Sequence, residues 1–215
     1  MGVDDIDIYD ANLRPLGRMD WMEAHQSGQW HRTFHCWVYR SDDNPRVLFQ
    51  LRSPNGNFPN MLDVSAAGHL AGGETIDEGI REAREELGID VDARDLLHIG
   101  ERVEVADQDN GQHNREYQSV FLLQTDKELA AFRPQIEEVW GLFWIPITDG
   151  LALFAGRIDQ LRVSGIEYDQ EVRGYIGTER TVRPDDFLPR IQRYYMAALI
   201  AAQRAVDGKP DIAIS

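Results

Sequence analysis

The sequence predicts a single α/β or α+β domain with a C-terminal extension. Three observations support this prediction. β-rich runs separated by turn signals occur on both sides of residues 75–88, which form a short amphipathic helix with its own capping signals. A longer helix with an apolar stripe is expected near the C-terminus. No internal repeat or clear linker divides the 215 residues, so one domain over 1–215 is the simplest account.

The individual elements follow in chain order. Residues 5–20 predict a β-hairpin that turns at 10–12, where aspartate and asparagine favour a turn. The expected strands are residues 33–39, 46–52, 96–105, 117–124 and 139–145. Asp185 or Asp186 is expected to cap the last helix, which runs to about Ala205. Its apolar stripe consists of Leu188, Ile191, Tyr195, Leu199 and Ala202.

The charge of the chain limits its partners. With 22 basic and 37 acidic residues the net charge is −15, which repels nucleic acid. A small anionic substrate is repelled too, unless bound cations reverse the local field. Cys36 is the only cysteine, and no apolar run approaches the ~20 residues of a membrane span. The acidic first ten residues lack a signal-peptide pattern. We therefore expect a cytoplasmic protein with a small-molecule substrate and neither nucleic-acid nor membrane partners.

The helix at residues 75–88 carries the strongest chemical signal. Thr75 and Glu78 form a capping box, and Gly88 suits the C′ position. The residues that share its apolar face are Ile76, Ile80, Ala83 and Leu87. The residues on the opposite side, expected to be exposed, are Glu82, Glu85 and Glu86. Like charges at these spacings repel, whereas a bound cation would make them ligands, and oxygen ligands select Mg²⁺ or Mn²⁺. A solvated acidic face is the alternative.

The stretch from Gly68 to Ile89 resembles the Nudix box, G-x5-E-x7-R-E-u-x-E-E-x-G-u, where u is apolar. Its fixed positions are filled by Gly68, Glu74, Arg81, Glu82, Glu85, Glu86 and Gly88, and its apolar positions by Ala83 and Ile89. Six residues instead of seven separate Glu74 from Arg81. This departure leaves the spacing of the helical carboxylates intact and affects only the placement of Glu74.

The resemblance implies a Nudix α/β/α sandwich with a mixed β-sheet, an N-terminal β-hairpin and a C-terminal helical extension. The core would span about 30–146, with 147–215 packed on it. It also implies that Glu82, Glu85, Glu86 and the Gly68 carbonyl hold Mg²⁺ or Mn²⁺, and that Arg81 orients a carboxylate. Water would then attack phosphorus in a diphosphate linkage. Glu82 and Glu116 are the candidates for the base.

Over about residues 6–146 the chain is similar to the Nudix proteins related to isopentenyl-diphosphate isomerase. In those isomerases, residues matching His25, His31, His69 and Glu116 bind a metal, so these four form a possible second metal site. The isomerases also have a catalytic cysteine where this chain has Ala67, and a further carboxylate where it has Asn114. Hydrogen-bonded structural imidazoles are the alternative, which is favoured for His35.

Three functions remain open at this stage. The first is hydrolysis of a nucleoside- or isoprenoid-type diphosphate, the second an isopentenyl-diphosphate isomerase-like reaction, and the third non-catalytic sensing of a diphosphate. Arg32, Arg52 and His69 are candidate substrate-binding residues, although arginines in so acidic a chain could equally form surface ion pairs. A homodimer is left open.

Overall fold

The protein is described by a computed structural model that covers residues 5–209 and 211–214. The strands are β1 (Asp5–Tyr9), β2 (Pro15–Asp20), β3 (Trp30–Arg40), β4 (Arg46–Arg52), β5 (Leu62–Asp63), β6 (Ala66–His69), β7 (Leu96–Asp107), β8 (His113–Gln124), β9 (Val139–Pro146), β10 (Leu161–Asp169) and β11 (Gly174–Val182). The helices are α1 (Trp21–Ser27), α2 (Ile80–Leu87), α3 (Ile147–Phe154) and α4 (Tyr194–Val206). The strands join one sheet, in which β3 and β8 are parallel and the other pairs antiparallel, so the sheet is mixed as expected.

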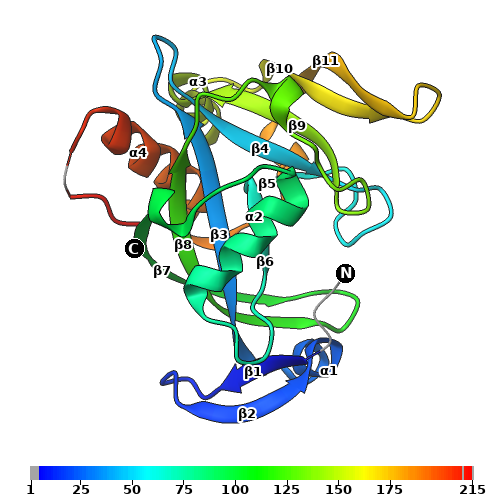
Figure 1. Cartoon of the computed structure of the whole chain (residues 1–215), viewed down its shortest axis with the longest axis vertical. Helices are drawn as coiled ribbons and strands as arrows, with labels where there is room; N and C mark the ends of the chain where they lie inside the picture. Colours follow the sequence, from blue (N-terminus) through cyan, green and yellow to red (C-terminus); the bar gives the residue numbers. More distant parts are fainter. Residues whose placement is uncertain (1–4, 210, 215) are drawn as a thin grey trace.

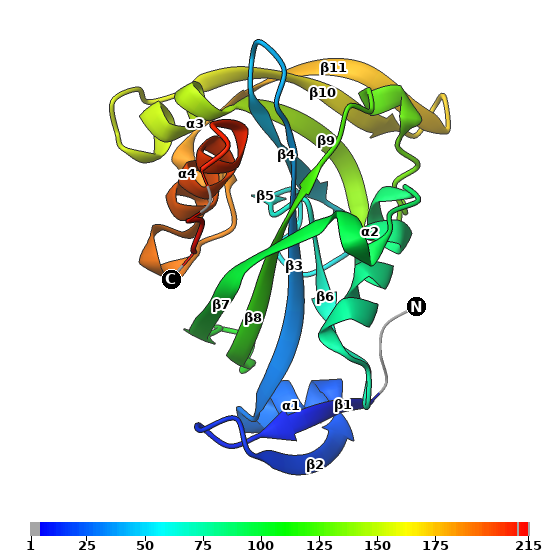
Figure 2. The same ribbon diagram turned by 60° about the vertical axis from the view of Figure 1, so that its left-hand side comes forward.

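Two apolar layers cover opposite faces of this sheet because side chains alternate along each strand. On β3, Phe34, Cys36 and Val38 pack in the core that contains the apolar side of α2. Trp37 and Tyr39 pack in the core that contains residues of α3 and α4. Figure 2 shows α2 on one side of the sheet and α3 with α4 on the other. The predicted α/β/α sandwich is confirmed.

The sheet opens between β3 and β4. These strands pair at Tyr39↔Val47 and Arg40↔Arg46 and then diverge. Further along, β3 pairs with β6 and β8, whereas β4 pairs with β5 and β9. Figure 1 shows β4 slanting away from β3, with β5 and β6 between them and α2 in front. The divergence leaves backbone and polar side chains of both halves facing one groove.

Most of the expected elements are present. The N-terminal hairpin is β1–β2, and each expected strand lies within an observed one. The first turn of the expected acidic helix is a 3₁₀ turn, Ile76–Gly79, after which α2 continues to Leu87. Helices α1 and α3 and the hairpin β10–β11 were not expected. The hairpin forms one end of the sheet and buries few side chains, so its apolar alternation is weak and the extension is not wholly helical.

The expected start of the last helix is wrong. Helix α4 begins at Tyr194, and the expected capping residues lie instead in the 3₁₀ turn Pro184–Asp186. Leu188 precedes a proline, a position that disfavours helical backbone. Gln192 and Arg193 have φ angles of 60° and 51°, which interrupt any right-handed helix. The apolar stripe therefore mixes residues of an irregular segment with residues of α4.

The residues after β9 share the core of the residues before it. Strand β10 pairs with β9, and α4 buries Tyr194, Ala198 and Leu199 against Trp37 and Phe49. Within residues 5–209 and 211–214, no helix combines the length and the apolar character that crossing a membrane would require.

Gly88 is predicted to be intolerant of alanine. It follows α2 with φ 61°, and a Cβ there would lie 2.1 Å from the Arg133 carbonyl oxygen. Gly156 has a similar φ of 68° but no atom within 4 Å of such a Cβ. Gly88→Ala should therefore lower the free energy of unfolding by about 2 kcal/mol more than Gly156→Ala, where only the left-handed backbone is penalised. Urea denaturation measures both, and equal losses would contradict the prediction.

Candidate active site

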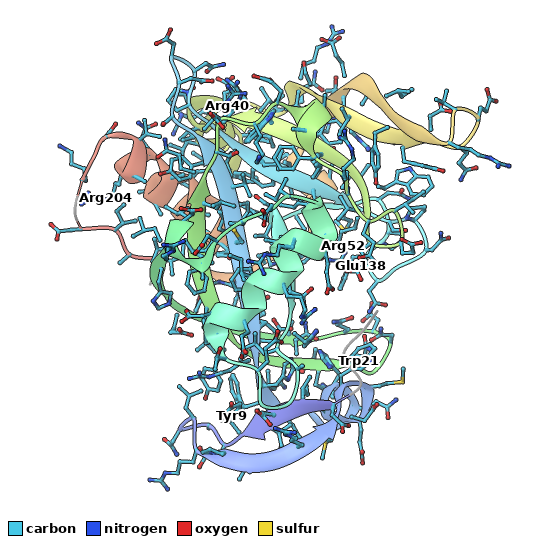
Figure 3. The ribbon with its side chains drawn as sticks, in the orientation of Figure 1. Tyr9, Trp21, Arg40, Arg52, Glu138 and Arg204 are labelled. Carbon is cyan, nitrogen blue, oxygen red and sulfur yellow. The ribbon has the colours of Figure 1, made fainter. Side chains whose placement is uncertain are left out.

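A cavity of about 320 Å³ occupies the groove between the two halves of the sheet. It is lined by the pocket-facing ends of β3, β4, β6 and β8, by α1 and α2, and by the segment before α4. Figure 3 shows Arg52 and Glu138 side by side at its rim, with Trp21 across from them. The acidic residues that line it are Asp63, Glu82, Glu85, Glu86, Glu116, Glu137 and Glu138.

Two of the three predicted carboxylates on α2 are buried in this cavity rather than exposed. Glu82 is 7% and Glu86 4% exposed, which corrects the expectation of an exposed acidic face, whereas the Glu85 side chain is 42% exposed. Glu86 accepts a hydrogen bond of 2.9 Å from the Ala67 backbone N–H. A Cβ at Gly68 would lie 2.1 Å from the carboxyl carbon of Glu82. Glycine at position 68 is thus what allows the helix to bring its acids against β6.

Arg81 connects the acidic residues of the motif. Its guanidinium lies 2.9 Å from a Glu82 oxygen and 3.1 Å from a Glu85 oxygen. It also donates two hydrogen bonds, of 3.1 and 3.2 Å, to the carboxylate of Glu74. Arg81 therefore contacts Glu74 despite the shortened spacing between them. The Glu74 carboxylate also accepts a hydrogen bond of 2.7 Å from the Ala71 N–H. Arg81 is placed to orient carboxylates, as the resemblance implies.

The burial of these acids raises their pKa values. Desolvation raises the pKa of Glu82 to about 7, with Glu138 and Glu85 adding to the rise and Arg81 opposing it. Burial likewise raises the pKa of Glu86 well above its usual value, with further contributions from Glu138 and Glu82. Both carboxylates would regain their charge readily beside a cation. The site therefore has the carboxylate oxygen donors that a hard divalent ion requires, and such an ion would favour their ionised forms.

The predicted second group of ligands does converge. One ligand atom from each of His25, His31, His69 and Glu116 lies within 4.8 Å of the others. Nδ1 of His25 lies 2.7 Å from the Trp21 carbonyl oxygen and Nδ1 of His31 lies 2.9 Å from that of Gln29, so each Nδ1 carries the proton. Each Nε2 therefore carries the lone pair with which the ring could bind a metal.

The Nε2 atoms of this group lie close together, and one of them has no partner among the described residues. Nε2 of His25 is 3.3 Å from Nε2 of His69, and Nε2 of His31 is buried without a hydrogen-bond partner. Burial lowers the pKa of His31, and it lowers that of His69 to about 3, so both rings are neutral near pH 7. Burial would raise the pKa of Glu116, but His31, His69, the hydrogen bond from Gln118 and the charge of Arg190 together lower it to about 2. Neutral imidazoles and one carboxylate are a donor set for a divalent metal.

The predicted arginines divide between the cavity and the surface. Arg52 lines the cavity, donates to the Asn57 carbonyl and lies 3.5 Å from Asp63. Arg32 does not line the cavity; its guanidinium lies 5.5 Å from the centroid of the Tyr9 ring, because it alternates with the pocket-facing residues of β3. Arg32 therefore packs on the Tyr9 ring and does not line the cavity. A further arginine, Arg115 of β8, pairs with Asp107 at 2.7 Å and does not line the cavity.

This chain has Ala67 where the isomerases have their catalytic cysteine, so no thiol is present at that position. His35 and Cys36 lie in register with Ala67 and Ala66 across β3 and β6. His35 and Ala67 line the cavity, whereas Cys36 points into the core beneath α2, where burial raises its pKa. Cys36 therefore cannot replace the missing cysteine at the pocket surface.

Several cavity residues were not found by sequence reasoning. They are Trp21, Thr33, Gln50, Asp63, Glu138 and Arg190. Each is brought to the cavity by a contact distant in sequence, such as the Asp63–Arg190 pair. No local pattern marks them. One signal was usable. Side chains alternate along a strand, and Thr33 lies two residues from both His31 and His35, so it faces the same side of β3 as they do.

Comparison with known proteins adds a family to this geometry. The family model described as NUDIX domain matches residues 29–163. A Nudix hydrolase of Clostridium acetobutylicum is 37% identical over 202 residues, which are 91% of this chain and 95% of that protein. An isopentenyl-diphosphate Delta-isomerase of Cereibacter sphaeroides is 32% identical over 65% of this chain and 75% of the isomerase. A Deinococcus radiodurans crystal structure has a TM-score of 0.53 at 24% identity, covering 71% of this chain and 89% of that one, and supports the fold alone.

The stability of the metal-free protein is predicted to fall as pH rises towards 8. The pKa of Glu82 is about 7 in the folded state against a usual 4.5, so the folded state binds this proton more tightly. The resulting stability is complete below pH 4.5 and is lost as pH rises through about 7, a change of about 1–3 kcal/mol. Mg²⁺ should therefore raise the Tm more at about pH 8 than at about pH 5.5.

Thermal denaturation with chelator or Mg²⁺ measures both effects. The Glu82→Gln variant should lose the part of the pH dependence that Glu82 supplies and keep that of Glu86, whereas Asp77→Asn, at an exposed position before α2, should keep both. A Tm that responds equally to Mg²⁺ at the two pH values would count against a site built from these carboxylates.

Proposed function

We propose that this protein is a metal-dependent pyrophosphohydrolase. The premise is that the chain belongs to the Nudix family and is a hydrolase of that family. Its substrate is a small molecule with a diphosphate linkage, of the nucleoside or isoprenoid type. The observation that carries the proposal is the pair of buried carboxylates, Glu82 and Glu86, which face a cavity next to the Gly68–His69 backbone. Charges removed from water in this way need a cation partner.

The residues that would hold the metal are those of the motif. Glu82, Glu85 and Glu86 supply carboxylate oxygens, and the Gly68 carbonyl supplies a fourth. These hard donors fit Mg²⁺ or Mn²⁺. Glu85 and Glu82 are joined through Arg81, so they would exchange this contact for the ion. When bound, such an ion neutralises charge on the phosphates and makes water a better nucleophile.

The other groups in the cavity have separate tasks in this proposal. Arg81 holds Glu82 and Glu85 in place until the ion binds. Glu82 in its charged form, with a pKa of about 7, is the stronger candidate to accept a proton from water; Glu116, whose pKa is lowered to about 2, stays ionised and is the weaker base. Arg52 and His69 line the cavity and bind substrate. Arg32 does not line the cavity and therefore does not bind the substrate in this proposal.

We further propose that His25, His31, His69 and Glu116 hold a second divalent ion. The proton positions on His25 and His31 leave lone pairs on both Nε2 atoms; that of His31 has no donor among the described residues, and that of His25 faces only His69 Nε2 at 3.3 Å. The neutral imidazoles suit Mn²⁺ or Zn²⁺. Asn114 also lines the cavity, where the isomerases have a carboxylate, and it is bound by the Gln108 amide.

The same histidine group favours an isomerase-like reaction as the second candidate. Against it stands Ala67, which leaves no thiol at the pocket surface, and the complete set of acids on α2. The two reactions separate in a direct assay: isomerase-like activity would move a double bond in an isopentenyl substrate without releasing phosphate. Non-catalytic sensing is a weaker candidate, because it gives no role to Glu82 and Glu86.

Glu86→Gln is predicted to lower kcat by about 100-fold or more, because it removes one charged metal ligand. The amide oxygen can still accept from the Ala67 N–H, and a buried charge is removed, so the Tm of the metal-free protein should not fall. Release of phosphate and monophosphate from a panel of nucleoside, sugar, coenzyme and isoprenyl diphosphates measures activity. Asp77→Asn is the control, and wild-type turnover by Glu86→Gln would refute the assignment.

His31→Gln is predicted to remove one bound metal ion per chain while leaving the site on α2 intact. It takes away a buried Nε2 lone pair without touching the helix. Elemental analysis after dialysis against Mn²⁺ or Zn²⁺ measures the stoichiometry. His98→Gln, whose imidazole pairs with Glu101 outside the cavity, is the matched control. Unchanged metal content in His31→Gln would show that the histidines are structural.

A further inference from the structure

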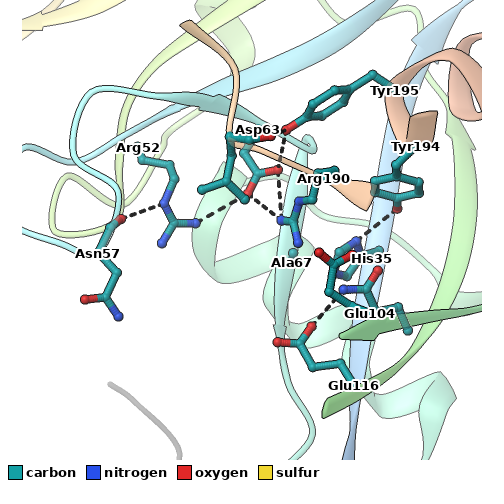
Figure 4. A network of polar contacts seen from close by, with 12 residues as sticks. His35, Arg52, Asn57, Asp63, Ala67, Glu104, Glu116, Arg190, Tyr194 and Tyr195 are labelled. Atoms are coloured by element: carbon teal, nitrogen blue, oxygen red, sulfur yellow. Dashed lines mark hydrogen bonds and ion pairs between the residues drawn. The ribbon is translucent and has the colours of Figure 1, made fainter. Parts of the chain in front are cut away.

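A second polar group lies in the cavity, and the proposed hydrolysis does not use most of it. Its centre is Asp63 of β5, a buried carboxylate held between two arginines. Arg190 Nη2 donates to both of its oxygens, at 3.0 and 2.8 Å, and Arg52 Nη1 lies 3.5 Å away. The Tyr195 hydroxyl lies 3.3 Å from the same carboxylate. Figure 4 shows Arg52, Asp63 and Arg190 in a row across the groove.

Arg190 has a donor that the protein does not use. Its side chain is 9% exposed, and its hydrogen bonds to Asp63 both use Nη2. The Nε atom is buried and has no hydrogen-bond partner among the described residues. A buried donor left in this state costs ~1–3 kcal/mol, so it points to a ligand that the cavity accepts.

Thr33 has the same property. It lies on β3 two residues from His35, lines the cavity, and is 3% exposed. Its hydroxyl oxygen has no partner among the residues that the structure describes. Valine would fill the same volume on a strand, so packing alone does not explain a hydroxyl here.

His35 supplies a further donor. The Trp37 Nε1–H donates to the Tyr194 hydroxyl at 3.0 Å, and this hydroxyl lies 2.9 Å from Nδ1 of His35. All three groups are satisfied when the hydroxyl accepts from Trp37 and donates to Nδ1, which leaves the His35 proton on Nε2. Burial lowers the pKa of His35 to about 3, so the ring is a neutral donor towards the cavity.

These donors lie beside both candidate metal positions. His35 is in register with Ala67, whose N–H is bound by Glu86. Thr33 is in register with His69 of the histidine group. Asp63, Glu116 and Glu104 face Arg190, so the charges here are mixed, but the buried polar atoms of the cavity lining that have no partner among the described residues are the donor Nε of Arg190 and the hydroxyl of Thr33. A group bound here would therefore be an oxyanion adjacent to the diphosphate linkage.

We propose that Arg190, together with Arg52, Thr33 and His35, binds the terminal phosphoryl group of the substrate, and that Asp63 positions the two arginines. This inference rests on the proposed function and narrows it to monosubstituted diphosphates. A terminal phosphoryl group carries more charge than a phosphate esterified on both sides. It also has three non-bridging oxygens, enough acceptors for the unpartnered donors. The C-terminal extension then contributes directly to substrate choice.

The test uses two non-hydrolysable probes with Mg²⁺: methylenediphosphonate, whose phosphonyl groups are free, and its P,P′-dimethyl ester. Calorimetry on the full chain measures both dissociation constants. Arg190→Gln should weaken binding of the free probe about 10-fold or more, and Thr33→Val about 3- to 10-fold, with the ester changed less than about 2-fold. Arg183→Gln is the matched control, since Arg183 is an exposed residue of the extension that binds Gln160 outside the cavity.

Thr33→Val keeps the test decisive if Arg190→Gln does not fold. It removes no hydrogen bond within the protein, so its Tm should equal that of the wild type. The proposed phosphoryl-binding site, hereafter the subsite, is refuted if Thr33→Val binds the free probe as the wild type does. It is also refuted if a variant loses affinity for the two probes equally. Hydrolysis is scored separately. A chain that binds the probes as expected but cleaves no diphosphate refutes the proposed function alone, and a hydrolase without this dependence refutes the subsite alone.

Discussion

The burial of two carboxylates against a strand backbone constrains the rest of this structure. Glu82 and Glu86 are carried on one short helix and reach β6 at Gly68 and Ala67, where a side chain at position 68 would collide with Glu82. Water cannot fully solvate these charges there, and their raised pKa values express that penalty. Arg81 from the helix supplies positive charge at this place, and the proposed metal ion would add to it.

The divergence of β3 and β4 provides the space for that arrangement. A continuous ladder between these strands would leave no cavity, because each would satisfy the backbone of the other. Instead β5 and β6 take over the pairing, and the pocket-facing residues of both halves meet across the gap. The extension closes the far side of this gap. Arg190 reaches Asp63, and Tyr194 reaches His35 and Trp37, so the C-terminal segment helps to form the wall of the candidate site.

How much of the site could be predicted varied with sequence distance. Arg81 and the three acids of α2 lie within one motif, where helical spacing alone relates them. The histidine group was proposed from resemblance, and its convergence depended on α1, β3 and β6 meeting. Arg32 was a candidate because arginine can bind phosphate oxygens, yet strand alternation turns it towards Tyr9. Arg190 had no local signal, and the expected helix around it did not form.

The sequence by itself determined the elements whose signals are local: the capped acidic helix, the N-terminal hairpin and most strands of the sheet. Helical and strand periodicity depend on neighbouring residues, so they can be seen without coordinates. Only the tertiary structure decided which acids are buried, which face of β3 meets the cavity, and that Arg190 pairs with Asp63. Those outcomes depend on segments far apart in the chain, and their pairing is chosen by the packing of the whole sheet rather than by any one stretch of residues.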